Sequence, residues 1–303
     1  MHICQDETED DSAMNRLFLH VQAAIVFSHV LNWNTVWQAL IIAIVQGITE
    51  FLPVSSTGHM ILAGHLIGFE GEFAKLYEIV IQLGTILAVP VLFHDRFFSS
   101  LKNLWPGQSG FMFWSKIVVA CVPAGLLGLA TKDFIDEHLM VPLPVAVALL
   151  VGALLIFAVE WYRDRDSEQG SVQSLDDVTF AQAFGIGVSQ CLALWPGFSR
   201  SAATIIGGRL VGLNTAVAAE FSFFLAMPMM VLTSGYALYK ASFPLTSADW
   251  AILAMGFVVS FLVAFAVVGR FIRFVQQKKL TVFAWYRLAL SLAFFVIIGL
   301  GWL

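Results

Sequence analysis

Six apolar runs, each about as long as a helix that crosses a bilayer, constrain this chain more than any other feature. Such a helix needs about 20 mainly apolar residues. The composition agrees, because 59% of the residues are hydrophobic and 12% are charged, against about 45–50% and about 25% in soluble domains. A soluble globule, a disordered chain and a nucleic-acid-binding protein are therefore excluded. The predicted spans are 77–93, 111–130, 139–159, 221–239, 250–269 and 282–303.

Two further apolar stretches, 36–68 and 180–212, are interrupted near the middle by Pro, Gly, Ser and ionisable residues. An exposed backbone amide costs several kcal/mol in hydrocarbon, so a helix breaks at membrane depth only where protein or a water-filled cavity receives the freed groups. We therefore predict two broken helices that open onto a polar pocket.

The two interrupted stretches also resemble each other. Setting Gly68 against Gly212 aligns 55–68 with 199–212, and both segments end in GxxxG. Three predicted spans lie between them, so two hairpins that each enter and leave on one side would be inverted relative to each other. The predicted fold class is an all-α polytopic membrane protein with two inverted repeats, each a re-entrant helical hairpin plus three transmembrane helices. One integral domain is expected over 34–303, with repeats at 36–161 and 178–303.

The N-terminal extension, 1–33, is expected to be partly disordered, with an interfacial helix over 17–33. A cleavable signal peptide is not expected, because an acidic leader replaces the positive segment that precedes such peptides. Cys4, Cys121 and Cys191 are scattered, and neither a disulfide nor a zinc site is indicated.

The bias of Lys and Arg in short loops predicts the orientation, because cytoplasmic loops carry the excess. Under this topology only Lys132 and Lys240 fall on one side. The other side should be cytoplasmic, and the pocket should open toward the outer face. The residues assigned to the cytoplasmic side are Arg96, Lys102, Lys116, Arg163, Arg165, Arg270, Arg273, Lys278, Lys279 and Arg287.

The first interruption combines groups that suit acid–base and nucleophilic chemistry. Gln46 and Glu50 are four residues apart, so they share one face of a helix. A helix that starts near Ser55 or Ser56 places His59 one turn further on. The free N–H groups of its first turn favour a bound phosphate.

The second interruption also combines hydroxyl groups with an expected helix start, but its charged residue is positive. Ser199, Arg200 and Ser201 follow a Pro-Gly pair at an expected helix start. The planar guanidinium suits a phosphate. Two half-helix N-termini that meet at the midplane predict a site for an anionic ligand, most simply a phosphate.

These motifs resemble those of the bacterial undecaprenyl-diphosphate phosphatase family of the bacitracin-resistance type. That family has (E/Q)xxxE followed by P-V-S-S-T-G-H, and later P-G-x-S-R-S-x-x-T. The corresponding segments here are 46–50, 53–59 and 196–204, and the similarity extends over 37–303. The resemblance implies hydrolysis of undecaprenyl diphosphate to undecaprenyl phosphate and inorganic phosphate at the bacterial inner membrane. It further implies roles in peptidoglycan synthesis, cell shape and bacitracin tolerance, and dependence on Mg²⁺ or Ca²⁺.

One position departs from the acidic form of the first motif, because Gln46 stands where the family also uses Glu. An amide cannot act as a base or bring charge to a metal, so that role falls to Glu50. Ser56 is the expected nucleophile, with His59 as its base or as the acid for the leaving group. Arg200 would bind the phosphate and stabilise its charge, and Glu50 would hold the cation or orient His59. Further substrate-binding donors are expected at Gln46, Ser55, Thr57, Ser199, Ser201 and Thr204.

Several alternatives stay open at this point. His59 itself could be the nucleophile, through a phosphohistidine. Broken helices in inverted repeats also suit a transporter or flippase for a phosphorylated lipid, although a carrier needs no nucleophile. The expected partners are a prenyl diphosphate and membrane lipid, not nucleic acid, and a homodimer is left open. Residues judged more ambiguous are His65 and Arg209, which favour helix packing, and Glu78, Gln82 and Glu220, which suit either the pocket or helix pairing.

Overall fold

The computed structural model describes residues 32–165, 172–240 and 244–302. This part of the chain is all-helical apart from its loops, with one isolated bridge between Val172 and Leu213 and no strand. Six helical segments are long and apolar enough to cross a membrane, which confirms the six predicted spans and makes this a multi-pass membrane protein. They are Glu72–Leu92, Ser109–His138, Pro142–Arg163, Thr215–Lys240, Ser247–Val275 and Thr281–Gly299. The predictions for the N-terminal extension lie outside the described residues, except at 32 and 33.

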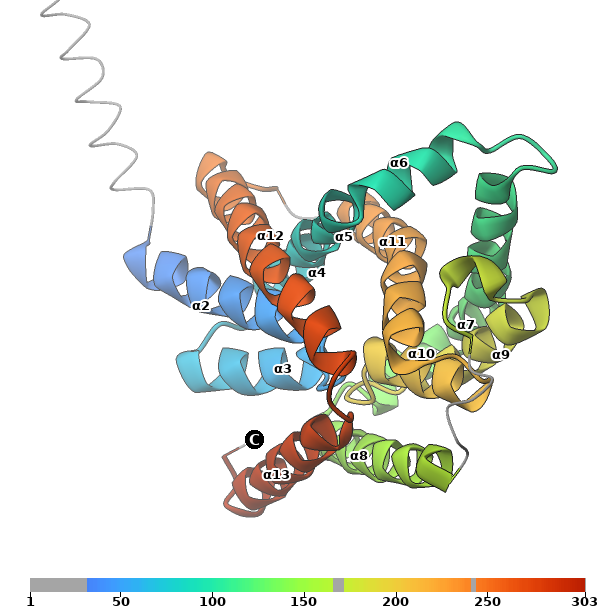
Figure 1. Ribbon diagram of the computed structural model, residues 1–303. Coiled ribbons are helices and arrows are strands. Elements are labelled where there is room, and N and C mark those ends of the chain that lie inside the picture. The colour runs from blue at the N-terminus through green and yellow to red at the C-terminus, as the bar shows by residue number, and fades with distance from the viewer. Residues whose placement is uncertain (1–31, 166–171, 241–243, 303) are drawn as a thin grey trace, which may run out of the picture.

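Figure 1 shows the helices, coloured by their order along the chain. The first predicted span is divided at Leu87, three residues before Pro90, because proline has no N–H to donate to a preceding turn. The elements are α2 (Trp33–Thr49), α3 (Ser56–Ile67), α4 (Glu72–Ile86), α5 (Ala88–Leu92), α6 (His94–Lys102), α7 (Ser109–His138), α8 (Pro142–Arg165), η1 (Leu175–Asp177), α9 (Phe180–Gln190), η2 (Cys191–Leu194), α10 (Arg200–Leu210), α11 (Thr215–Lys240), α12 (Ser247–Val275) and α13 (Thr281–Gly299).

Both interrupted stretches are broken where their sequences predict. The first is α2 and α3, which pack together with six residues between them. The second is α9, continued by the short helix η2, and then α10, which packs back on α9. Figure 1 shows each pair side by side, with α11 and α12 crossing between them. The two breaks face the interior of the molecule.

Small residues let neighbouring helices approach closely around these pairs. A Cβ on Gly47 of α2 would lie 2.8 Å from the carbonyl oxygen of Ser260 in α12. A Cβ on Gly187 of α9 would lie 2.5 Å from that of Ala120 in α7. Such contacts are typical of helix packing in membranes, where van der Waals contact replaces the hydrophobic effect between helices. These contacts hold α2 against α12 and α9 against α7.

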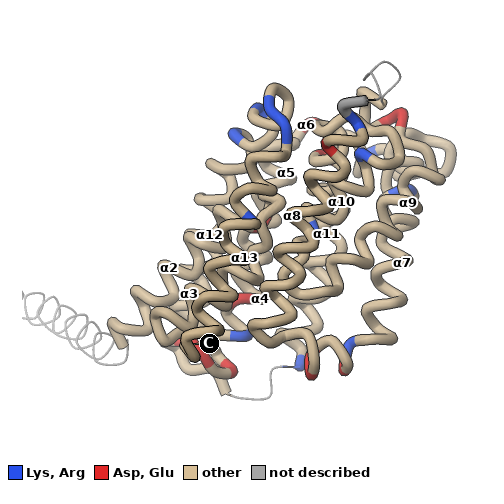
Figure 2. The backbone as a smooth tube through the Cα atoms, turned by 90° about the horizontal axis from the view of Figure 1, so that it is seen from below, with Lys and Arg blue, Asp and Glu red and all other residues tan. Residues whose placement is uncertain are grey.

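The charged residues divide unevenly between the two ends of the molecule. Figure 2 shows most Lys and Arg segments at the end where α6 lies, and fewer at the end with the C-terminus. Arg287, assigned above to a cytoplasmic loop, is instead fully buried inside the protein. That assignment was wrong, because loop counting cannot tell an arginine in a turn from one that points into the bundle from α13.

Candidate active site

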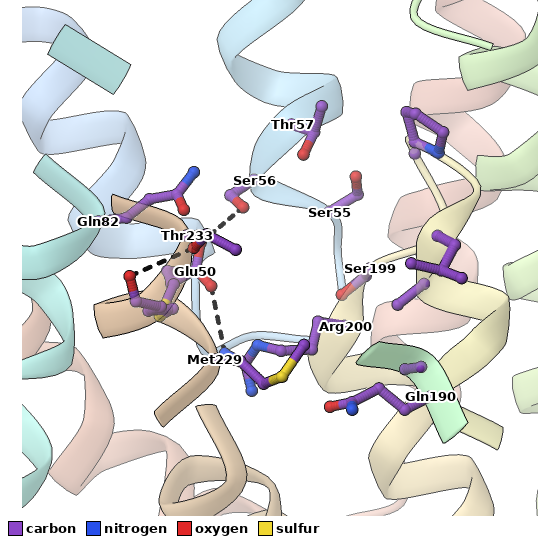
Figure 3. A pocket seen from close by; sticks show the side chains of 16 residues that line it. Glu50, Ser55, Ser56, Thr57, Gln82, Gln190, Ser199, Arg200, Met229 and Thr233 are labelled. Carbon is purple, nitrogen blue, oxygen red and sulfur yellow. Dashed lines mark hydrogen bonds and ion pairs between the residues drawn. The ribbon is translucent and has the colours of Figure 1, made fainter. Parts of the chain in front are cut away.

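A cavity of about 280 Å³ lies where the two breaks meet. Both helix restarts contribute to its wall, and Figure 3 shows Ser55, Ser56 and Thr57 facing Ser199 and Arg200 across it. The chain therefore brings together two segments that are far apart in sequence. The lining residues are Glu50, Ser55, Ser56, Thr57, Gln82, Ala124, Gln190, Ala193, Leu194, Pro196, Gly197, Ser199, Arg200, Met229, Met230 and Thr233.

The two helix restarts use the same backbone device. Ser55 and Ser199 cap α3 and α10, and among the described residues they alone have positive φ without being glycine, at 71° and 79°. Each side-chain oxygen accepts a hydrogen bond at 3.2 Å from the N–H three residues on, that of Gly58 or Ala202. Such backbone conformations cost about 1–3 kcal/mol and persist only where the surroundings enforce them.

The Glu50 carboxylate bonds to residues from both breaks. Its Oε2 accepts hydrogen bonds of 2.8 Å from both Ser56 Oγ and Gln46 Nε2. Its Oε1 forms a 3.2 Å ion pair with Arg200 Nη2. The expected nucleophile and the expected phosphate-binding cation, which come from different breaks, therefore meet on one carboxylate (Figure 3).

The ion pair is well shielded, since 15% of the Arg200 side chain and 6% of the Glu50 side chain are exposed. In such surroundings the attraction between charges is stronger than in water. Arg200 Nη1 also donates to the carbonyl oxygen of Ser222 in α11, at 3.0 Å. The guanidinium is thus held from two sides and keeps a fixed direction into the cavity.

Three expected substrate-binding residues support the site from behind. Gln46 is fully buried and reaches Glu50. Ser201 is fully buried and donates to the carbonyl oxygen of Leu52 at 2.8 Å, which joins the two breaks. Thr204 is fully buried and bonds the Ser222 hydroxyl at 2.6 Å. None of the three lines the cavity.

His59 lies on the other side of α3. Its Nδ1 is 2.7 Å from the carbonyl oxygen of Ser55, and its Nε2 is 2.7 Å from the Tyr286 hydroxyl of α13. Since a carbonyl only accepts, the proton belongs on Nδ1, and Nε2 accepts from the tyrosine. Ser56 Oγ therefore bonds Glu50 and not His59, whose two ring nitrogens are taken by Ser55 and Tyr286.

Arg287 of α13 forms hydrogen bonds to both breaks. Its guanidinium donates to the carbonyl oxygens of Pro53, at 3.2 Å, and Gly197, at 3.3 Å. Each carbonyl lies two residues before one of the strained serines. Two more donations go to the carbonyls of Ala148 and Leu149 in α8. Sequence reasoning missed this contact, because nothing in the pattern around α13 reveals that its arginine points inward.

The sequence indicates other residues of the cavity wall less clearly. Gln82 was ambiguous and does line the cavity, whereas Glu78 does not. Gln190 aligns with Gln46 when the two stretches are superposed as above, so its position could have been found. Met229, Met230 and Thr233 of α11 carry no sequence signal, because apolar helix contacts look alike whether or not they border a cavity.

Glu220, also ambiguous from sequence, lies in a different cavity of about 520 Å³. Arg96 lines that cavity too, and it forms a bidentate pair with Asp176 at 2.6 and 2.8 Å. Glu220 is therefore not part of the site around Glu50.

The donor set suits a hard cation only with help from a ligand. In the described part of the chain, no three His, Cys, Asp or Glu side chains are grouped to hold a metal. Glu50 is the carboxylate of this cavity, and hydroxyl oxygens of Ser55, Ser56 and Thr57 are beside it. Mg²⁺ is commonly bound by one or two carboxylates together with substrate phosphates and water. The residues present fit that arrangement.

The chain is similar to known bacterial proteins over most of its length. Residues 39–293 match the family described as "Bacitracin resistance protein BacA". A protein of Maridesulfovibrio salexigens named "Undecaprenyl-diphosphatase" is 50% identical over 260 residues, which cover 85% of this chain and 97% of that protein. One of the same name from Clostridium tetani is 46% identical over 252 residues, covering 83% and 92%. The chain therefore belongs to the BacA family of bacitracin resistance proteins.

Proposed function

We propose that this protein is an undecaprenyl-diphosphatase, which hydrolyses undecaprenyl diphosphate to undecaprenyl phosphate and inorganic phosphate. The observation that carries the proposal is the Glu50 carboxylate, which binds Ser56 of one break and Arg200 of the other. Relatives that cover most of this chain bear the name of that activity. By recycling the lipid carrier of the cell wall, the enzyme would also support tolerance of bacitracin, as the family description suggests.

Ser56 is the proposed nucleophile. Its Oγ attacks the terminal phosphorus of the lipid diphosphate, while its proton passes to Glu50 Oε2, to which it is already hydrogen-bonded. The bond from phosphorus to the bridging oxygen breaks, and the lipid monophosphate leaves with the proton that Glu50 passes on to it. Water then attacks the phosphoserine and gives its proton to the regenerated Glu50 carboxylate. Glu50 returns this proton to Ser56 Oγ as the bond from phosphorus to that oxygen breaks and inorganic phosphate leaves. Glu50 thus acts as the base where His59 was expected.

Arg200 is the proposed electrostatic partner of the transferred phosphate. Charge develops on the phosphoryl oxygens as the bonds change, and a prearranged guanidinium stabilises it. The free N–H groups in the first turns of α3 and α10 add partial positive charge at the same place. Once substrate binds, the Arg200–Glu50 pair is replaced in part by a contact with phosphate.

His59 is proposed to position the site instead of reacting. Both of its nitrogens are occupied, by the Ser55 carbonyl and by Tyr286. This holds the first turn of α3 in place. Its removal should therefore lower kcat through the placement of Ser56, and the phosphohistidine alternative is not favoured.

A divalent cation, Mg²⁺ or Ca²⁺, is proposed to be held by Glu50 together with the diphosphate oxygens. When bound, it would supply positive charge to the oxygens of the leaving group. The protein's own part is to present one carboxylate and several hydroxyls to that place.

We further propose the two inverted repeats, each with a re-entrant hairpin. The supporting observation is a set of contacts that recurs at the same spacing in both halves. Gln38 donates to the carbonyl of Ile67, as Gln182 does to that of Val211. The loop after each hairpin closes alike, from Phe69 N–H to Gly64 and from Leu213 N–H to Gly208.

The site is proposed to open to the outer face of the bacterial inner membrane. The supporting observation is the excess of Lys and Arg at the α6 end of the molecule (Figure 2), which is typical of a cytoplasmic side. The flippase alternative has less support, since a carrier has no use for a hydroxyl bonded to a carboxylate base.

The test is phosphate release from a prenyl diphosphate by the purified protein in detergent. With Mg²⁺ or Ca²⁺ we expect turnover that a chelator removes and that added cation restores. Ser56→Ala should lower kcat by at least about 100-fold, the usual scale for a catalytic group. No release by the wild type under any cation would contradict the proposal.

A further inference from the structure

We infer that Gln190 is a phosphate-binding residue of this cavity. The inference rests on the proposed function and deepens it, because it names a side chain that grips the diphosphate beside Arg200. Gln190 lies outside the segments 46–50, 53–59 and 196–204 that carry the sequence resemblance.

The first observation is an unsatisfied amide. Gln190 is 2% exposed, and both its Nε2 and its Oε1 lack a hydrogen-bond partner among the described residues. A buried polar atom without a partner costs about 1–3 kcal/mol, and most buried polar groups in proteins have one. A side chain that carries two such atoms needs an explanation.

The second observation is where that amide lies. Gln190 is the last residue of α9 and lines the cavity together with Ser199 and Arg200. In Figure 3 its amide end points to the side of the cavity where Arg200 lies, away from Ser56. The amide and the guanidinium therefore border the same part of the cavity.

Two other glutamines provide a comparison. Gln46, which occupies the matching place in the first stretch, donates from Nε2 to Glu50 at 2.8 Å, and only its Oε1 lacks a partner among the described residues. Gln182, on the same helix as Gln190, donates to the Val211 carbonyl at 3.0 Å. Gln182, which lies outside the cavity, is bonded at both ends of its amide, whereas Gln190, which borders the cavity, is bonded at neither.

A phosphate group matches both ends of the amide. Its charged oxygens accept from Nε2, and the hydroxyl of a hydrogen phosphate donates to Oε1. Because both polar atoms of the amide are covered, this contact requires a side chain of the wall to move. Met229 and Met230 line the same cavity, and methionine side chains change conformation at little cost.

Gln190→Leu separates this role from a structural one. Leucine removes both unsatisfied atoms, so the melting temperature of the purified protein should stay the same or rise. If the amide binds phosphate, kcat/KM for the prenyl diphosphate should fall about 10- to 100-fold, the scale of a hydrogen bond to a charged group. Gln190→Glu, which adds a negative charge, should lower it further.

Gln182→Leu is the matched control, because it removes a satisfied amide from the same helix. Its melting temperature should fall, while its kcat/KM stays within about twofold of the wild type. Inhibition by inorganic phosphate and by a prenyl monophosphate then distinguishes which phosphate Gln190 holds. The affected inhibition constant should rise at least about fivefold in Gln190→Leu.

The inference is overturned if Gln190→Leu and Gln190→Glu both keep kcat/KM and both inhibition constants within about twofold of the wild type. Should Gln190→Leu fail to fold, Gln190→Glu and the two inhibitors decide alone. A wild type that releases no phosphate overturns the proposed function itself, which is a separate result.

Discussion

The two breaks share a backbone and differ in chemistry. In both, the helix restarts at a serine with positive φ whose side chain caps the new helix, and in both Arg287 holds the carbonyl two residues earlier. The first break then presents Glu50 and Ser56, whereas the second presents Arg200 in the place that corresponds to Ser56. One backbone arrangement, used twice, therefore supports a carboxylate and a hydroxyl on one side and a guanidinium on the other.

The placement of opposite charges in the two breaks shows how an apolar chain can assemble a charged site. Ionisable groups at membrane depth are costly unless they are paired or face a cavity. By dividing the carboxylate and the guanidinium between two breaks, the chain pairs them only when both halves have folded together. Catalytic geometry and the association of the halves then depend on the same contact.

The largest effects should come from the residues in which the two breaks differ. Ser56→Ala removes the proposed nucleophile and Arg200→Ala removes the charge proposed to stabilise the phosphate, so each should lower kcat by about 100- to 1,000-fold. Phosphate release under saturating prenyl diphosphate measures this. Ser99→Ala on the exposed helix α6 is the control and should change kcat less than about twofold. Equal turnover in all the variants would show that the difference between the breaks has no catalytic meaning.

The next effect should come from the residue that the breaks share. Arg287→Met leaves the buried carbonyls of Pro53 and Gly197 without their donor, at a cost of about 1–3 kcal/mol each. We expect a lower melting temperature together with a kcat reduced about 10-fold or more, because both strained serines lose support. Gly152→Ala should act in the same direction, since its methyl group would meet the Arg287 guanidinium.

As a control for Arg287, Gly125→Ala places a methyl group in open space and should be silent. Should Arg287→Met keep both the melting temperature and kcat of the wild type, the two breaks would not depend on a common support.

A smaller and equal effect is expected at the two capping serines. Ser55→Ala and Ser199→Ala each remove a cap worth about 1 kcal/mol, so both should lower the melting temperature by a similar amount. Ser55→Gly and Ser199→Gly should cost less, because glycine adopts positive φ without strain. A large difference between the two positions would argue that the breaks are not equivalent in backbone.

The smallest effect concerns the paired glutamines outside the cavity. Gln38→Leu and Gln182→Leu each remove a hydrogen bond to a carbonyl at the end of α3 or α10, worth about 0.5–1.5 kcal/mol. Gln182→Leu also removes the bonds that Gln182 Oε1 accepts from Thr179, so it should lower the melting temperature more than Gln38→Leu does, with phosphate release nearly unchanged in both. A Gln38→Leu variant that melts like the wild type would limit the likeness of the two stretches to the breaks themselves.

Sequence reasoning succeeded where a local pattern carries the information. Hydropathy gave all six spanning helices, and Pro, Gly and Ser located both breaks, because backbone groups in a membrane must be satisfied. The motif residues Glu50, Ser56 and Arg200 could also be named in advance, and they do meet in one cavity.

It failed where the direction of a side chain decides the outcome. Ser56 pairs with Glu50 and not with His59, and Arg287 points into the protein and not into a loop. Neither orientation follows from spacing alone, because the partners that hold His59 and Arg287 come from elements far away in the sequence. The methionines of α11 that line the cavity were equally invisible, since only the packed fold shows which apolar residues border a space.

The most direct measurement is trapping of the enzyme during turnover of a prenyl diphosphate labelled in its terminal phosphate, with parallel quenches in acid and in denaturing detergent at neutral pH, followed by mass spectrometry of the labelled peptide. We predict phosphate on Ser56 in both quenches of the wild type and none in Ser56→Ala. Phosphate on His59 that the neutral quench preserves and acid removes, or full turnover by Ser56→Ala, would contradict the account.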